Sequence, residues 1–276
     1  MTARNSVPLR GRDAELARIK RRLQEVAAGV GAVIVIEGRA GLGKTRLLEE
    51  CAALAAEMSF RVGQGTAEPG RSVVELEALL NALFGGDKPL LTRTSLHNLQ
   101  VSAEQTFWLL QDIQSLIEGA ALKDRLAICL DDLQWAGPRC AMAMGQLPYR
   151  LASLPVAWIL AFRPNQGIQP VLEAKNGLLD AGAEYISLGP LDTSAVAEIA
   201  EDILGAPPDS DLLEKATGGK APRHVGRVSR TTLHRPRSGR HVWHGGIRTR
   251  RANPRTYGRR HLQRKRRPLG FRTRSY

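Results

Sequence analysis

Apolar and polar residues follow two periods along this chain, one typical of strands and one of helices. Short apolar runs rich in β-branched residues, bounded by glycine or charged residues, predict buried strands. The predicted strands are residues 32–36, 61–66, 126–130, 156–162 and 185–188. Apolar residues recurring every three or four positions predict amphipathic helices. The predicted helices include residues 13–28, 73–83, 103–122 and 194–204. Another helix is predicted after the first strand, with Leu47, Leu48, Cys51 and Leu54 on one face.

The alternation of helices and strands predicts the fold class. Strands separated by helices form a mostly parallel sheet that is covered on both faces, an α/β three-layer sandwich. Residues 85–100 read as a loop between two of the helices. In such sheets ligands bind at the carboxyl ends of the strands. Residues that follow the predicted strands are therefore the candidates for a functional site.

A complete phosphate-binding pattern, G-x-x-x-x-G-K-[ST], follows the first predicted strand. Its residues are Gly38, Arg39, Ala40, Gly41, Leu42, Gly43, Lys44 and Thr45. The glycines let backbone amides close around phosphate oxygens, and the start of the next helix adds its positive end. Lys44 would reach the β- and γ-phosphates, and the Thr45 hydroxyl would bind Mg²⁺. A glycine-rich turn that carries Lys-Thr by chance is the alternative, but the flanking strand and helix favour nucleoside triphosphate binding.

Acidic and basic residues follow two later strands. Asp131 and Asp132 end the strand at 126–130, where one carboxylate could hold Mg²⁺ and the other could orient an attacking water. Arg163 ends the strand at 156–162, and it would stabilise charge on a γ-phosphate if the two strands are neighbours. A solvated acidic turn and a surface arginine are the alternatives. The phosphate-binding pattern upstream favours the functional interpretation.

Composition limits the class of protein. The chain has 276 residues, enough for one α/β domain and an appendage. No apolar run approaches the roughly 18 residues of a membrane span, and the N-terminus lacks a signal-peptide core. Three cysteines, Cys51, Cys129 and Cys140, show no metal-binding spacing and are expected to be reduced core residues. We therefore expect a cytoplasmic protein with no membrane partner.

The net charge of +13 is confined to the C-terminal segment. Residues 1–218 contain all 27 acidic residues and 21 basic ones, whereas residues 219–276 contain 19 Lys and Arg and no Asp or Glu. The nucleotide-binding part is thus mildly acidic. The basic tail is a different kind of sequence.

Several motifs together resemble a known family. Residues 7–16 (VPLRGRDAEL), residues 131–136 (DDLQWA) and residues 188–192 (LGPLD) are similar to the motifs of STAND-type P-loop ATPases, within the AAA-like group. Over residues 7–218 the chain is most similar to the Orc1-like AAA ATPase module of large LuxR-type regulators and multidomain adenylyl cyclases. The resemblance implies a P-loop NTPase fold with five parallel strands, a helical lid, and ATP with Mg²⁺ as ligands.

The resemblance also implies roles for individual residues. The glycines of the loop, Lys44 and Thr45 would hold phosphates and Mg²⁺, and Asp131 would serve the metal. Asp132 would act on the attacking water and Arg163 on the γ-phosphate. Gly11 and Arg12 would lie near the base and ribose. Catalysis would therefore rest on Asp132 and Arg163.

The chain departs from the family pattern at two places. Gly137 stands where the family usually has Asp, a change that we expect to matter little for phosphate chemistry. After Gly219 the family continues with Asn-Pro and an apolar helix of the lid, but here the sequence becomes basic. We therefore expect an ATPase core at residues 1–205, the start of a truncated lid at 206–218, and a disordered tail at 219–276.

Three interpretations of the tail remain open. It could bind nucleic acid through its positive charges and interspersed aromatic residues, it could be a disordered solvated segment, or it could be translated out of frame. It lacks the two apolar-periodic helices of a helix-turn-helix. Two functions follow: a slowly hydrolysing Mg-ATP switch module of a signalling or transcriptional regulator, or a nucleic-acid-binding protein with an auxiliary ATPase. No cyclase catalytic domain fits in this length.

Overall fold

A computed structural model of the chain describes residues 8–70, 76–92, 105–209 and 213. These residues all belong to the first of the two compact units into which the chain divides, residues 1–227 and 228–276. Several predicted segments lie outside the described residues: the basic tail, the second half of the predicted loop at 85–100, most of the lid segment at 206–218, and the first residues of the helices predicted at 73–83 and 103–122.

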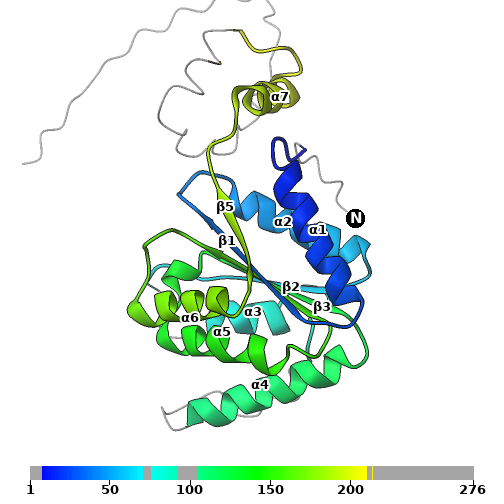
Figure 1. Cartoon of the computed structure of the whole chain (residues 1–276), viewed down its shortest axis with the longest axis vertical. Coiled ribbons are helices and arrows are strands. Elements are labelled where there is room, and N and C mark those ends of the chain that lie inside the picture. Colours follow the sequence, from blue (N-terminus) through cyan, green and yellow to red (C-terminus); the bar gives the residue numbers. More distant parts are fainter. Residues whose placement is uncertain (1–7, 71–75, 93–104, 210–212, 214–276) are drawn as a thin grey trace, which may run out of the picture. The chain divides into compact units, whose positions relative to one another are not determined.

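A five-stranded parallel sheet forms the centre of the described part (Figure 1). Its strands are β1 (Ala32–Gly38), β2 (Arg61–Thr66), β3 (Leu126–Asp131), β4 (Val156–Phe162) and β5 (Glu184–Leu188). They lie in the order β2-β3-β4-β1-β5, and all four pairings are parallel. Because β4 lies between β1 and β3 and all three strands are parallel, their carboxyl ends lie side by side at one edge of the sheet.

Helices cover both faces of this sheet, as the alternating pattern predicts. They are α1 (Asp13–Ala27), α2 (Lys44–Glu57), α3 (Glu77–Phe84), α4 (Gln105–Ala121), α5 (Pro138–Arg150) and α6 (Gln169–Asp180). A further helix, α7 (Thr193–Leu204), follows β5 along the chain. A short 3-10 turn, η2 (Leu133–Trp135), follows β3. Figure 1 shows α1 and α2 on one face and α3 to α6 on the other, which makes the three-layer α/β sandwich.

The two faces of β1 point into two separate cores. Ile34 and Ile36 pack with the apolar stripes of α1 and α2, whereas Val35 packs with the helices of the opposite face. This alternation is the period of two that a strand imposes on its side chains. A strand with both faces covered has no solvent side, so its sequence is a continuous apolar run.

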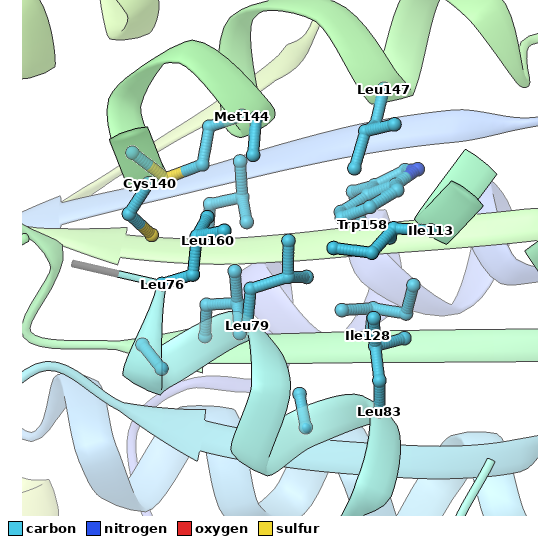
Figure 2. Packing of buried hydrophobic residues seen from close by; sticks show 14 of the residues in the cluster. Leu76, Leu79, Leu83, Ile113, Ile128, Cys140, Met144, Leu147, Trp158 and Leu160 are labelled. Atoms are coloured by element: carbon cyan, nitrogen blue, oxygen red, sulfur yellow. The ribbon is translucent and has the colours of Figure 1, made fainter. Parts of the chain in front are cut away.

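The larger core lies between the sheet and helices α3 to α6 (Figure 2). Trp158 and Leu160 of β4 occupy its middle, and Trp158 is the largest fully buried side chain of the described residues. Around them lie Leu76, Leu79, Leu83, Ile113, Ile128, Cys140, Met144 and Leu147. Burial of each such side chain contributes roughly 1.5–3 kcal/mol, so this core contributes much of the stability of the domain.

Two glycines of β2 allow α3 to approach the sheet closely. A Cβ atom at Gly63 would lie 2.0 Å from the carbonyl oxygen of Ala82, and one at Gly65 would lie 1.9 Å from that of Ala78. Real Cβ atoms do not come this near to another heavy atom. Glycine at these two positions is therefore a requirement of backbone contact between strand and helix.

The predicted elements match the structure closely where a strand or a long helix was expected. β2 and β4 have the predicted bounds, β1 extends to Gly38 and β3 to Asp131. Helices α5 and α6 were not assigned residue ranges from the sequence. Their patterns are obscured by Pro148 inside α5 and by a proline at the start of α6.

Within the described residues, no helix combines the length and apolar character needed to cross a membrane.

Candidate nucleotide-binding site

The loop between β1 and α2 contains the backbone geometry of a phosphate cradle. Gly41 and Gly43 have φ angles of +83° and +85°, values that glycine adopts without strain. Gly43 directly precedes α2, and a Cβ atom there would meet nothing within 4 Å. The start of α2 lies directly after this glycine, and the positive end of the helix favours an anion there.

Lys44 is the buried cation of this loop. Only 6% of the residue is exposed, and its Nζ donates a hydrogen bond to the Arg39 carbonyl at 3.2 Å. Burial lowers the pKa of Lys44; Asp132 and Asp131 act to raise it, and Arg163 acts to lower it. The ammonium group thus lies among the two carboxylates and the guanidinium. A polyanion would favour its charged form.

Thr45 and Asp131 meet across the site. The Thr45 hydroxyl donates a hydrogen bond of 2.6 Å to Asp131 Oδ2, which brings together residues 86 positions apart in the sequence. Asp131 is the last residue of β3 and is only 4% exposed, while its other oxygen, Oδ1, accepts the Asp132 N–H at 2.7 Å. Both carboxylate oxygens of Asp131 are therefore oriented by the protein.

The backbone turns sharply at Asp132, the residue that follows β3. Asp132 has a φ of +49°, a left-handed conformation that Asp tolerates better than most residues. Its Oδ1 accepts a hydrogen bond of 2.7 Å from Gln134 Nε2 and lies 3.6 Å from Arg163 NH2. About 29% of the Asp132 side chain is exposed, which leaves it accessible to water.

Arg163 extends from the end of β4, the strand next to β3. Its guanidinium carbon lies 5.9 Å from the centre of the Trp135 ring, within reach of a weak cation–π contact. Its Nε is buried and has no hydrogen-bond partner among the described residues. A guanidinium with an unused buried donor is suited to receive an anion.

Arg12 connects the N-terminal segment to the phosphate loop. Its NH2 donates to the carbonyl of Leu42 at 3.3 Å and to that of Gly189, just after β5, at 2.6 Å. Its NH1 contacts Glu15 at 3.0 Å, and the residue is 6% exposed. Gly11 has a φ of +66° and packs directly on α7, where a Cβ atom would lie 2.5 Å from Ala195 Cβ.

Comparison with known protein families bears on this arrangement. Residues 8–159, more than half of the chain, match the model of the AAA ATPase domain family. This chain belongs to that family. The matched range contains the phosphate loop, Thr45, Asp131 and Asp132, and it ends within β4, before Arg163.

Solved structures show the same fold as this AAA ATPase domain. The ORC2 protein of Aeropyrum pernix, in ADPNP-ADP complexes, aligns with a TM-score of 0.53 at 18% identity over 75% of this chain and 55% of that chain. The ORC1 protein of the same organism, in complex with DNA, aligns with a TM-score of 0.52 at 17% identity over 80% and 59%. The chain therefore spans less than two thirds of these relatives. A search of curated proteins returned no match.

The structure brings most of the predicted site residues together in the AAA ATPase domain. The phosphate loop, Asp131, Asp132 and Arg163 lie at the carboxyl ends of β1, β3 and β4, which are adjacent strands. Arg12 contacts the loop from another side, through the Leu42 carbonyl, whereas Gly11 lies against Ala195 of α7. Gln134 was predicted only as part of the motif at residues 131–136, without its contacts. Its contact with Asp132 is local, but no local signal could have revealed its contact with Arg163, which depends on β3 and β4 being neighbours.

The donor groups of this site suit Mg²⁺ with a nucleotide. Mg²⁺ prefers oxygen ligands, and neighbouring ligands of an octahedral ion lie about 3 Å apart. The Thr45 hydroxyl and the Asp131 carboxylate, 2.6 Å apart, need only a small shift to share one ion. Lys44 and the amides of the loop would meet the phosphates. The residues present therefore fit both groups.

Proposed function

We propose that this AAA ATPase domain is a Mg-ATP-binding, slowly hydrolysing switch module of a signalling or transcriptional regulator. The observation that carries this proposal is the 2.6 Å contact between Thr45 and Asp131, with Lys44 beside them. A hydroxyl, a carboxylate and a lysine that converge next to a helix start match the needs of a triphosphate with its metal. The regulator context rests on the resemblance of residues 7–218 to the ATPase modules of LuxR-type regulators.

Each residue of the site has a role in the proposed reaction. Lys44 and the loop amides bind and orient the phosphates, and Thr45 and Asp131 hold Mg²⁺, which supplies charge neutralisation when bound. Asp132 orients the attacking water and accepts its proton at a carboxylate oxygen. Arg163 stabilises charge on the γ-phosphate. Gly11 and Arg12 lie on the side of the base and ribose.

The switch follows from a difference between two nucleotide states. ATP would hold Arg163 and the loop in one arrangement, and ADP, without a γ-phosphate, would release Arg163. Other domains of such a regulator would respond to this change. Hydrolysis is slow in this proposal and serves to reset the module.

Calorimetry on two variants tests the site. Lys44→Ala should abolish ATP binding, because each charge-assisted bond from the ammonium contributes about 1.5–3 kcal/mol and the buried cation provides several. Asp132→Asn should largely retain ATP affinity and slow turnover, because it keeps the shape but cannot accept a proton. Lys20→Ala and Asp13→Asn, at exposed positions of α1, are matched controls that should behave as wild type. Equal ATP affinity in wild type and Lys44→Ala would overturn the assignment.

The basic tail supports a second candidate function, nucleic-acid binding with an auxiliary ATPase. Nineteen positive charges without a single acid would bind polyanions with a steep salt dependence. Deleting residues 219–276 should remove polyanion binding and leave nucleotide affinity unchanged under either proposal. Sequence preference at physiological salt separates them: the switch module should show none. Reading the gene in all three frames around codon 219 tests the third interpretation, since an apolar lid helix in a neighbouring frame would mark the tail as out-of-frame sequence.

A further inference from the structure

Gln134 joins the two candidate catalytic residues through a single carboxamide. Its Nε2 donates to Asp132 Oδ1 at 2.7 Å, and its Oε1 accepts the backbone N–H of Arg163 at 3.1 Å. Gln134 itself is only 3% exposed. A buried amide that uses its donor end on one strand and its acceptor end on the next fixes the distance between them.

The backbone around Gln134 holds this side chain in place. It belongs to the turn η2, in which Trp135 N–H donates to the Asp132 carbonyl at 3.0 Å. On its other side lies Gly167, with a φ of +120°, where a Cβ atom would come within 3.5 Å of the Gln134 Cα. The carboxamide is thus positioned before any ligand binds, so little conformational freedom is lost when it orients Asp132.

Asp132 and Arg163 carry opposite charges and lie near one another. Arg163 NH2 is 3.6 Å from Asp132 Oδ1, the same oxygen that accepts from Gln134, and the two side chains are 29% and 27% exposed. The two side chains thus already form a long ion pair, while the Gln134 donor is the nearer partner of Oδ1. Loss of Gln134 would leave Arg163 as the remaining side-chain partner of that oxygen among the described residues, and a shorter ion pair would draw the carboxylate from the water and the guanidinium from the phosphate.

We propose that Gln134 is a positioning residue of the ATPase site, which aims the Asp132 carboxylate and limits its ion pair with Arg163 to the long contact of 3.6 Å. Both side-chain contacts of Asp132 among the described residues use Oδ1, which leaves Oδ2 for the water that the proposed function assigns to it. This inference rests on the proposed function. It adds a residue that touches neither nucleotide nor metal and that acts through two others.

Two variants of the full-length protein separate the contacts of Gln134. Gln134→Met keeps the length of the side chain and removes both hydrogen bonds. Gln134→Glu keeps the acceptor for the Arg163 N–H and replaces the donor to Asp132 by a negative charge. Both should lower kcat by about 10- to 100-fold, the range found when an orienting partner of a site residue is lost. ATP affinity by calorimetry should stay within about threefold, because the phosphate contacts remain. Gln24→Met, at an exposed position of α1, is the matched control and should equal wild type.

A double-mutant cycle tests whether Gln134 acts through Asp132. In an Asp132→Asn background, Gln134→Met should cause little further loss of kcat, since the carboxylate that it aims is already absent. A merely structural role would instead give the same fold loss in both backgrounds, and that result would overturn the inference. So would a kcat within about twofold of wild type in both single variants, or a loss of ATP affinity as large as the loss of kcat. If wild type binds ATP and turns it over, these results affect this inference alone; wild type without turnover would overturn the proposed function as well.

Discussion

Replacing Lys175 by methionine removes one partner of a buried ion pair at the end of β1. Lys175 Nζ lies 2.5 Å from Glu37 Oε1, and Tyr185 donates to Glu37 Oε2 at 2.7 Å. The two charged side chains are only 10% and 13% exposed. Because Glu37 directly precedes Gly38, these contacts join β1, α6 and β5 immediately before the phosphate loop.

The variant leaves a buried carboxylate with a tyrosine as its remaining side-chain partner. Removing one member of a buried pair costs about 3–5 kcal/mol, and we expect about 3 kcal/mol here because Glu37 retains some solvent contact. At about 2–4 °C per kcal/mol for a domain of this size, Tm should fall by roughly 6–12 °C. In contrast, Lys175→Met combined with Glu37→Gln should recover most of this loss, since no charge is left buried. Lys20→Met, at an exposed position of α1, is the control.

The loss should depend on pH. Burial acts to raise the pKa of Glu37, but the hydrogen bonds from Lys175 and Tyr185 outweigh it, and the pKa lies below its ordinary value of 4.5. A lowered carboxylate pKa contributes stability that is present above pH 4.5 and is lost as the pH falls through the folded pKa. The deficit of Lys175→Met should therefore be full at neutral pH and shrink under acid conditions.

Urea denaturation of wild type and the three variants across this pH range measures these differences. A deficit below about 1 kcal/mol at neutral pH, the size of a surface pair, would refute the view that the pair is buried. A double variant as unstable as Lys175→Met alone would refute the role assigned to the isolated carboxylate.

Two further predictions concern the core. The three buried cysteines, Cys51, Cys129 and Cys140, should resist maleimide in the native protein and should all react in urea. The reason is that burial raises the pKa of each thiol, to about 12 for Cys129 and Cys140. Gly65→Ala should destabilise the protein by more than about 3 kcal/mol, because its Cβ would overlap the Ala78 carbonyl, whereas Gly119→Ala in α4, where nothing lies within 4 Å, should stabilise it by up to about 1 kcal/mol. Thermal melting of the two glycine variants checks the second prediction, and equal effects would contradict it.

The sequence predicted the strands well, for a physical reason. A strand covered on both faces must be apolar throughout, so β4 could be bounded from its composition alone. Helices α5 and α6 were harder, because proline, glycine and small residues interrupt their apolar stripes while tertiary packing holds the helices together. The phosphate loop was predictable because its chemistry is local: eight consecutive residues contain both the turn and the cation.

The rest of the site depends on strand order, which local patterns do not encode. Arg163 was predicted to contribute only if its strand lay beside that of Asp132, and β3 and β4 are indeed paired. The same pairing creates the bridge through Gln134, whose importance no reading of residues 131–136 alone could reveal. The cluster is thus a property of the sheet.

The contacts of the N-terminal segment determine how a change at the loop could reach α7. Arg10 pairs with Asp202 and Glu198 of α7 on the surface, and such exposed pairs contribute about 0–1 kcal/mol each. Arg12 is buried and donates hydrogen bonds to the carbonyls of Leu42, in the loop, and of Gly189. Separating these segments would remove the carbonyl partners of a buried guanidinium, which is costly. The Arg10 contacts can therefore break and re-form at little cost, whereas the Arg12 contacts persist. If α7 moves during nucleotide exchange, we expect it to rotate about Arg12. The hydrogen bonds of Arg12 to Leu42 and Gly189 should persist during that movement.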